Sequence, residues 1–287
     1  MKILLTGASG RLGRFIVSAI NKDSHELVVV TRKPMASEEN ARPYIVDFGD
    51  TTALRSVFQK ERPDVVIHLA AITGSVCEQD NDLAYSINVD LTKRLAELAR
   101  DYEVSRFIFA STAAVYNQQN LSPTDEYTNI DPLSVYGKTK LAAEKELELV
   151  AQDASNKTSF TSLRIFNVYG PGFDQSLINR LLNSTEKHPV ELIGLENFYR
   201  DYIYVKEVAR AMLQRATQKV TALYSVYNIA SGVATSNKEL LDTLRTIKKT
   251  PYCTVVSERE SYSWANIERA REEFGFSPST KLTLVDD

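Results

Sequence analysis

Short apolar runs alternate with amphipathic stretches along the first part of this 287-residue chain, and that alternation limits what it can fold into. The apolar runs are rich in Ile, Val, Leu and Phe, which is typical of strands buried on both faces of a parallel sheet. They lie at Lys2–Thr6, Glu26–Thr31, Asp64–Leu69, Arg106–Ala110 and Phe160–Ile165, with a weaker candidate at Tyr44–Val46. Helical patterns lie between them at Leu12–Asn21, Thr51–Gln59, Leu83–Tyr102 and Ser134–Ala151. Strands that alternate with helices predict βαβ units and a doubly wound parallel sheet.

The pattern changes after Asn167, where Gly170–Gly172 interrupts the chain. Shorter strand-like pieces then alternate with helical ones. The strands are expected at Val190–Ile193, Tyr202–Tyr204 and Val226–Ile229, and the helices at Val205–Thr217, Asn237–Thr246 and Ala265–Phe274. We therefore expect a first domain over residues 1–167, to which 202–231 contribute, and a small C-terminal α/β lobe over 168–287.

Composition excludes several classes of protein. The chain is 43% hydrophobic and 25% charged with a net charge of −3, so neither nucleic acid nor an anionic membrane is an expected partner. No apolar run reaches the roughly 18 residues of a membrane helix, and we expect no signal peptide, because the first apolar run reads as a strand. Cys77 and Cys253 are far apart and the three histidines are scattered, so we expect neither disulfides nor a metal site. A cytoplasmic location is the default expectation.

A glycine-rich turn follows the first predicted strand. Gly7, Gly10 and Gly13 have the spacing GxxGxxG and stand at the start of a helix, with Arg11 and Leu12 inside the turn. Small residues let the backbone approach a pyrophosphate, and the helix N-terminus offers free N–H groups. A glycine pattern alone is weak evidence, but this context predicts a Rossmann-type dinucleotide-binding domain.

The residues after the second predicted strand select the dinucleotide. An acidic residue there would bind the ribose hydroxyl of NAD. This chain has Thr31-Arg32-Lys33 instead, and Arg11 adds a further positive charge nearby. Because a guanidinium binds phosphate through two hydrogen bonds, we expect NADP(H), with NAD(H) as the alternative.

A phenol and an ammonium one helical turn apart form the candidate catalytic pair. Tyr136 and Lys140 share one face of a predicted helix that follows the strand Arg106–Ala110 and a polar turn over Ser111–Tyr116. A second YxxxK match, Tyr202/Lys206, lies in a strand-like run, where the two side chains would be far apart. A neighbouring ammonium and the positive nicotinamide would favour the phenolate, and the Thr112 hydroxyl would bind the reacting oxygen. These residues predict hydride transfer between a nicotinamide and an alcohol or ketone.

Taken together, the motifs resemble those of the extended short-chain dehydrogenase/reductases, in particular the NAD(P)-dependent nucleotide-sugar epimerase/dehydratase family. The resemblance covers nearly the whole chain. It rests on Gly7–Gly13, Asp47-Phe48, His68–Ala71, Asn88–Asp90, Ser111–Tyr116, Tyr136–Lys140, Leu163–Gly172, Arg200–Val205 and Tyr227–Gly232.

The resemblance implies a role for each matching residue. Tyr136 is the general acid/base, Lys140 tunes it and holds the nicotinamide ribose, and Thr112 binds the substrate oxygen. The other implied cofactor contacts are Asp47, Phe48, Leu69, Ala70, Ala71, Asn88 and Phe166. Asn167 and Arg200 match positions that contact the nucleotide-sugar diphosphate. His68 is expected to be structural, and Asp125-Glu126 to lie in a solvated loop.

Departures from the family narrow the activity. Dehydratases of the family carry Asp-Glu directly after the Thr, whereas Ala113-Ala114 follow Thr112 here, so 4,6-dehydration is not expected. We expect an NADP-dependent oxidoreductase acting at C4 of a nucleotide sugar as a 4-ketoreductase. The alternatives are a 4-epimerase with tightly bound NAD(P) and a non-catalytic NADP-binding regulatory subunit. The helices Leu83–Tyr102 and Ser134–Ala151 resemble those that pair related chains into homodimers.

Overall fold

The chain packs into two compact units, each built from several segments. A computed structural model describes residues 1–22, 25–34, 41–117, 121–128, 130–218, 220, 222–255, 259–279 and 281–282. The first unit comprises residues 1–115, 132–164 and 209–227, and the second comprises 116–131, 165–208 and 228–287. The two units are described separately below.

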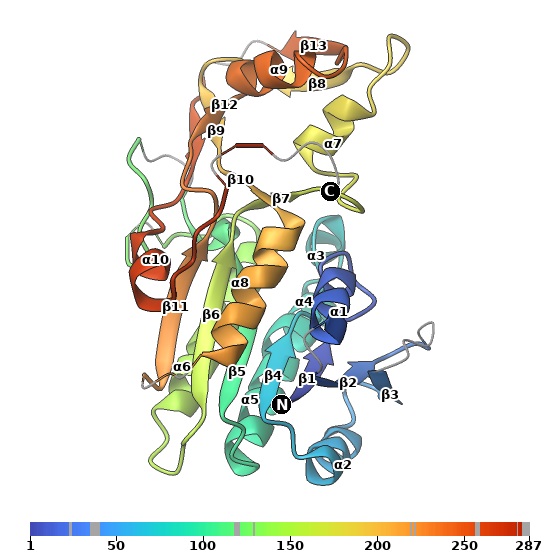
Figure 1. The fold of residues 1–287 in the computed structure, drawn as a ribbon, viewed down its shortest axis with the longest axis vertical. Helices are drawn as coiled ribbons and strands as arrows, with labels where there is room; N and C mark the ends of the chain where they lie inside the picture. Colours follow the sequence, from blue (N-terminus) through green and yellow to red (C-terminus); the bar gives the residue numbers. More distant parts are fainter. Residues whose placement is uncertain are drawn as a thin grey trace. The chain divides into compact units, whose positions relative to one another are not determined.

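The first unit is built on a seven-stranded sheet in the order β11-β6-β5-β4-β1-β2-β3 (Figure 1). This sheet confirms the predicted Rossmann-type fold. Its strands are β1 (Lys2–Thr6), β2 (Glu26–Thr31), β3 (Ala41–Ile45), β4 (Val65–His68), β5 (Arg106–Thr112), β6 (Ser159–Ile165) and β11 (Tyr224–Ile229). The β1–β2, β1–β4, β2–β3 and β4–β5 pairs are parallel.

Helices cover both faces of this sheet. Successive residues of each strand point to opposite sides, and both sides carry apolar side chains that must be buried. One hydrophobic cluster joins Leu4 and Phe107 to α2 (Thr51–Glu61), α5 (Leu91–Asp101) and α6 (Val135–Ala151). Helices α1 (Gly13–Lys22) and α8 (Val205–Thr217) run along the opposite face (Figure 1). Strands covered on both sides must be apolar throughout, which explains the unbroken hydrophobic runs in the sequence.

The order of the strands reverses between β1 and β4. The pair Thr6–His68 lies at the carboxyl ends of these two strands. The glycine-rich turn after β1 and the loop after β4 therefore leave the sheet side by side. In open α/β sheets this switch point is where ligands bind.

Side-chain caps mark where the helices of the first unit begin. The Asp50 carboxylate accepts a hydrogen bond from Ala53 N at 2.9 Å and starts α2. The Ser134 hydroxyl accepts one from Gly137 N at 3.0 Å and starts α6. Each cap satisfies an N–H group that the helix itself leaves unpaired.

The second unit consists of small sheets and short helices. Its sheets are β10 (Tyr202–Tyr204) with β7 (Asn167–Tyr169), β12 (Thr235–Ser236) and β14 (Ser261–Ser263) with β9 (Phe198–Arg200), and β13 (Tyr252–Val255) with β8 (Val190–Ile193). Its helices include α7 (Leu177–Leu182), α9 (Asn237–Arg245) and α10 (Glu268–Phe274).

A buried carboxylate ties three segments of the second unit together. Asp201 is fully buried between β9 and β10. Its oxygens accept hydrogen bonds from Ser231 N at 2.7 Å, the Ser231 hydroxyl at 2.6 Å, Gly232 N at 2.9 Å and Ala265 N at 3.2 Å. Burial raises the pKa of Asp201 to about 6 despite these donors.

The expected long helix over Leu83–Tyr102 is divided into three parts. It consists of α4 (Asn81–Tyr85), a π-helical turn η1 (Ser86–Asp90) and α5. Within η1, the Asn88 side chain bonds to backbone and side-chain groups outside its own helix. Single π-turns in helices often occur at functional sites.

Two other predictions also differ from the structure. β5 continues through Ser111 and Thr112, which were expected in a turn. The strands β7, β9, β12, β13 and β14 were not predicted, because each is only two to four residues long and depends on partners distant in sequence. None of the described helices is long and apolar enough to cross a bilayer.

The close packing at the switch point can be tested with one methyl group. A Cβ on Gly13 would lie 2.3 Å from Gly7 O and 2.5 Å from Ala8 O. Gly13→Ala should therefore push α1 away from the turn and destabilise the protein by about 1–3 kcal/mol, as overpacking typically does. Chemical denaturation of the purified variant measures this change.

Gly49→Ala is the matched control, because its Cβ would meet only Asp47 Oδ1 at 3.5 Å. Equal stability of the two variants would show that α1 does not approach the turn as closely as described.

Candidate active site

The glycine-rich turn forms a cradle with no room for a side chain at Gly7 or Gly13. Gly10 N donates to Gly7 O at 2.9 Å, and Gly7 has φ +75°, which favours glycine. A Cβ on Gly7 would lie 2.7 Å from Ala70 N. The cradle fits a pyrophosphate, because the first N–H groups of α1 lie beside bare backbone. Arg11 is exposed at this turn, and Leu12 is half-buried.

Arg32 and Phe48 lie together beyond the end of β2. Arg32 is exposed, and its guanidinium carbon lies 5.6 Å from the centre of the buried Phe48 ring. Arg94 Nη2 donates to Phe48 O at 3.1 Å and holds this backbone in place. Asp47 is exposed and accepts from Gly49 N. The structure thus brings together three residues, Arg32, Asp47 and Phe48, that the sequence predicted to bind one end of the dinucleotide.

Thr112 and Tyr136 are held near one another by the packing of α6. Thr112 is the last residue of β5, and Tyr136 lies in the first turn of α6. A Cβ on Gly137 would lie 2.3 Å from Ala114 O, so only glycine lets this turn approach the end of β5 so closely. The requirement for Gly137 was not predicted from the sequence, although it stands inside the YxxxK motif.

Burial dominates the electrostatics of the pair on α6. It raises the pKa of Tyr136 to about 12, and the Thr112 hydroxyl, hydrogen-bonded to the phenol, acts in the opposite direction. Burial lowers the pKa of Lys140 to about 7, and the negative charge of Glu144 opposes that change. Lys140 is buried, with Nζ 3.9 Å from the centre of the Phe109 ring. We expected Lys140 to lower the pKa of Tyr136, but in the structure burial outweighs any such effect.

His68 belongs to a buried chain of hydrogen bonds. Thr6 Oγ1 accepts from Ala70 N and lies 2.6 Å from His68 Nδ1. On the other side, His68 Nε2 lies 2.9 Å from Thr92 Oγ1, which donates to Asn88 O. These partners require the hydrogen on Nε2, and burial lowers the pKa of His68 to about 3. A neutral, fully bonded imidazole is structural, as expected.

Asn88 holds the loop after β4 against α6. Its side chain accepts from Ile72 N at 2.8 Å and donates to Ile72 O and Thr139 Oγ1, both at 3.0 Å. Thr139 Oγ1 in turn donates to Tyr136 O at 3.0 Å. The amide of Asn88 is therefore bonded within the protein, and through it the loop that holds Leu69, Ala70 and Ala71 is fixed relative to Tyr136.

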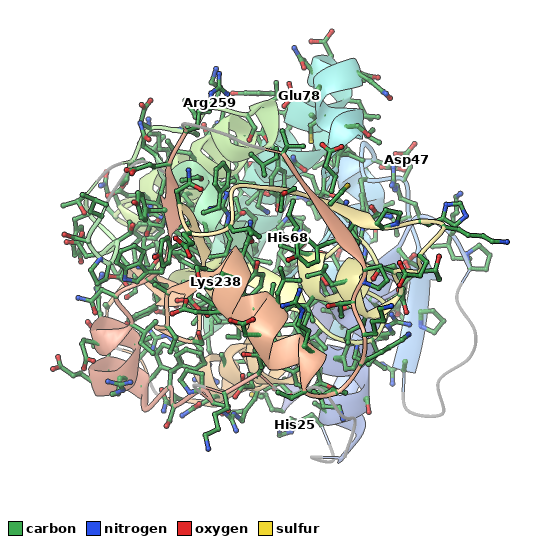
Figure 2. All side chains as sticks on the ribbon, turned by 90° about the horizontal axis from the view of Figure 1, so that it is seen from above. His25, Asp47, His68, Glu78, Lys238 and Arg259 are labelled. Atoms are coloured by element: carbon green, nitrogen blue, oxygen red, sulfur yellow. The ribbon has the colours of Figure 1, made fainter. Side chains whose placement is uncertain are left out.

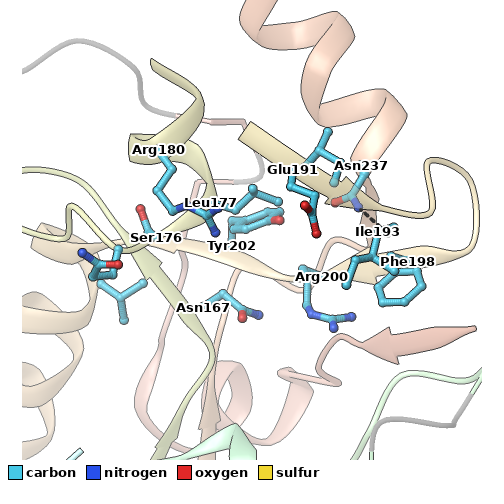
Figure 3. A pocket seen from close by; sticks show the side chains of 13 residues that line it. Asn167, Ser176, Leu177, Arg180, Glu191, Ile193, Phe198, Arg200, Tyr202 and Asn237 are labelled. Atoms are coloured by element: carbon cyan, nitrogen blue, oxygen red, sulfur yellow. Dashed lines mark hydrogen bonds between the residues drawn. The ribbon is translucent and has the colours of Figure 1, made fainter. Parts of the chain in front are cut away.

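The second unit contains a cavity of about 430 Å³ (Figure 3). Asn167 and Arg200, both predicted to bind substrate, line it. Arg200 Nη1 donates to Tyr199 O at 2.7 Å and to Ser261 O at 3.1 Å, and Nη2 donates to the Ser261 hydroxyl at 2.9 Å. Asn167 Nδ2 donates to Asp201 O at 3.0 Å. These bonds fix both side chains at the edge of the cavity.

Arg180, Glu191 and Asn237 are among the polar lining residues that were not predicted. Arg180 comes from α7, Glu191 from β8 and Asn237 from the start of α9, and Figure 3 shows their side chains around the cavity. No motif could have marked them, because their proximity depends on how three short elements pack. Tyr202 also lines the cavity. It lies in β10 and Lys206 in α8, so this second YxxxK match does not form a helical pair.

Phe166 and Glu126 are both buried in the second unit. Phe166 is buried, and its ring centre lies 6.1 Å from that of Tyr116. Glu126 was expected in a solvated loop, which was wrong: it is buried and accepts from Asn228 N at 2.9 Å. Its neighbour Asp125 stays closer to the surface and accepts from Tyr127 N and Thr128 N.

Within the described part of the chain, no cluster of three or more His, Cys, Asp or Glu side chains could hold a metal ion. Figure 2 shows the side chains in a view turned by 90° from that of Figure 1. His25 and Asp47, both of the first unit, lie apart from one another in that view.

Comparisons with known proteins match nearly the whole chain. A family model described as "NAD dependent epimerase/dehydratase family" matches residues 3–230. A putative UDP-glucose 4-epimerase of Methanocaldococcus jannaschii is 30% identical over 254 residues, covering 85% of this chain and 81% of the relative. The structure of MoeE5 in complex with UDP-glucuronic acid and NAD is 28% identical, with a TM-score of 0.84, covering 98% and 95% of the two chains.

A third similar protein is a UDP-glucose 4-epimerase of Thermotoga maritima, solved with UDP-glucose. It is 26% identical, with a TM-score of 0.81, and the match covers 97% of this chain and 94% of that one.

Proposed function

The chain belongs to the NAD dependent epimerase/dehydratase family, and from this premise we propose that it is a nucleotide-sugar 4-epimerase. The substrate would be a nucleoside diphosphate sugar whose C4 hydroxyl changes configuration. Similarity to a putative UDP-glucose 4-epimerase and to a UDP-glucose 4-epimerase supports this reaction. The expected 4-ketoreductase is retained below as a second candidate.

The observation that carries the proposal is the convergence of Thr112, Tyr136 and Lys140 at the carboxyl end of β5. A bound nicotinamide would accept hydride from C4 and return it to the opposite face of the same carbon. Tyr136 takes the proton of the C4 hydroxyl during oxidation and gives it back during reduction. The Thr112 hydroxyl binds the same oxygen, and the Lys140 ammonium holds the nicotinamide ribose.

The protonation states of Tyr136 and Lys140 suit both the oxidation and the reduction at C4. With a pKa raised to about 12, the Tyr136 phenol is protonated at neutral pH and ready to donate a proton to a 4-keto sugar. Accepting a proton requires nearby positive charge, which the Lys140 ammonium and an oxidised nicotinamide provide. Neither step needs a second acid/base pair, and Ala113-Ala114 offer none, which weighs against dehydration.

The cavity of the second unit is proposed to bind the nucleoside diphosphate. Its volume of about 430 Å³ lies within the usual range of small-molecule sites. Arg180 and Arg200 line it, and the positive charge of their guanidinium groups attracts phosphate oxygens. Asn167 adds an amide beside them.

A 4-ketoreductase that consumes NADPH is the second candidate, favoured by Arg32 and Lys33 at the end of β2. A non-catalytic regulatory subunit is disfavoured, because Thr112, Tyr136 and Lys140 are all present. A homodimer paired through α5 and α6 stays a prediction. Sedimentation at the mass of a single chain would contradict it.

Tyr136→Phe tests the proposed chemistry. The variant keeps the packing of the ring and loses the hydroxyl, so turnover should fall by roughly 10²–10⁴-fold, the usual contribution of general acid–base catalysis. The purified protein is incubated with UDP-, dTDP- and GDP-sugars, and the C4 epimers are quantified by NMR. An epimerase forms the epimer with no net change in nicotinamide absorbance, whereas a reductase consumes NADPH only with a 4-keto sugar.

Tyr85→Phe is the control, because Tyr85 is 50% exposed on α4 and belongs to neither site. It should turn over at the native rate. Near-native turnover of Tyr136→Phe would show that another group transfers the proton.

Arg32→Ala tests the predicted preference for NADP(H). A charged hydrogen bond contributes about 1.5–3 kcal/mol, so the ratio of NADP to NAD affinity should fall by about 10- to 100-fold. Calorimetric titration of both cofactors gives the ratio. Arg55→Ala removes a similarly exposed guanidinium on α2 and should leave it unchanged. A native protein with equal affinities would contradict the preference.

A further inference from the structure

Three polar side chains form a hydrogen-bonded network in the core of the first unit. Glu144 on α6 lies between Ser111 on β5 and Arg164 on β6, and all three are at most 3% exposed. Arg164 Nη2 donates to Glu144 Oε2 at 2.6 Å, and Nε lies 3.1 Å from Oε1 and 3.2 Å from Oε2. The Ser111 hydroxyl donates to Oε1 of the same carboxylate.

A buried ion pair is weak evidence for a gain in the stability of the fold. Removing two charges from water is unfavourable, and well-packed apolar residues in place of a buried ion pair often leave a protein equally or more stable. The surrounding core is apolar, with Phe109, Ala143 and Leu147 all buried. Stability alone therefore gives no strong reason for two charges at this place in the core.

The network touches both elements that carry the candidate catalytic residues. Ser111 directly precedes Thr112 on β5. On α6, residues 136, 140 and 144 follow at intervals of one helical turn and share one face. The Glu144 carboxylate is thus placed one turn from the Lys140 ammonium, and Arg164 and Ser111 hold it there.

Burial opposes a charge on Lys140, whereas the face of the Phe109 ring attracts a cation. The Lys140 Nζ faces the Phe109 ring, and the ionisable groups around it are His68 on β4, Cys77 on α3 (Ser75–Gln79), and Tyr136 and Glu144 on α6. His68 is neutral in its buried hydrogen-bond chain. Burial raises the pKa of the Cys77 thiol, and that of the Tyr136 phenol is also raised. Glu144 is therefore the one carboxylate of this set.

We propose that Glu144 is a positioning residue that keeps the Lys140 side chain charged, and that Arg164 and Ser111 fix it in place. This inference deepens the proposed function, because it rests on the role of Lys140 in holding the cofactor. It adds three residues to the site that do not touch the substrate or the cofactor.

The direction of the effect follows from the balance at Lys140. Burial lowers the pKa of Lys140 to about 7, and Glu144 raises it. Without the Glu144 charge, the pKa of Lys140 falls further and the ammonium is lost at a lower pH. Any property that needs the ammonium, such as cofactor affinity, then weakens at a lower pH as well.

Glu144→Gln tests this directly, because it removes the charge and keeps the shape. Lys140 is titrated by the NMR shift of its ε-carbon in protein labelled with ¹³C-lysine, with the signal assigned through Lys140→Arg. The midpoint should fall by about 1 pH unit or more in Glu144→Gln. The pH at which cofactor affinity declines should fall by the same amount. A purely structural role would lower the melting temperature and leave both midpoints unchanged.

Glu148→Gln is the matched control, since Glu148 is exposed one turn further along α6. It should leave the Lys140 midpoint at the native value. If Glu144→Gln does not fold, Glu144→Asp retains a carboxylate for Arg164 at a greater distance from Lys140, and the midpoint should again fall. An unchanged midpoint in the variant that folds overturns the inference.

The role proposed for Glu144 and the proposed epimerase activity are tested by different results. A lowered Lys140 midpoint in a protein that turns over no nucleotide sugar leaves this inference standing and contradicts the proposed function. An unchanged Lys140 midpoint in a protein that is an active epimerase supports the proposed function and contradicts the role of Glu144.

Discussion

The parallel pairing of β1 with β4 determines where chemistry can occur in the first unit. Because Thr6 lies opposite His68 at the ends of these strands, the glycine-rich turn and the loop after β4 leave the sheet together. Gly7 has no room for a side chain against Ala70, and Gly13 has none against the turn itself. The cradle, the end of β5 and the first turn of α6 all depend on this arrangement, since β5 pairs with β4 and α6 packs over both.

Buried, hydrogen-bonded polar groups fix the positions of the loop after β4 and of α6 more closely than apolar packing does. The chain from Thr6 through His68 to Thr92 crosses the core beside the switch point. Asn88 links the loop after β4 to Thr139, and Thr139 bonds to the carbonyl of Tyr136. Buried groups bonded on every side have few alternative arrangements, so they hold a site rigidly. In the same way, the buried Glu144–Arg164 pair is proposed to hold a carboxylate one helical turn from Lys140.

Much of the first unit could be predicted because its signals are local. Buried strands such as Glu26–Thr31 are unbroken apolar runs, and glycine spacing marks the turn. The division of the helix at Asn88 could not be foreseen, because it depends on bonds to Ile72 and Thr139. Arg180, Glu191 and Asn237 meet only through the packing of short elements. Glu126 was misjudged because its acceptor role depends on Asn228, about 100 residues away.

The central claim is that this chain moves a hydride from C4 of a nucleotide sugar and returns it to the same carbon. A substrate that carries deuterium at C4, incubated with the holoenzyme in ordinary water, tests it most directly. The account predicts that the epimer formed retains deuterium at C4 and that the labelled substrate reacts more slowly. Loss of deuterium to the solvent would mean that C4 is deprotonated instead, and would contradict the mechanism built on Thr112, Tyr136 and Lys140.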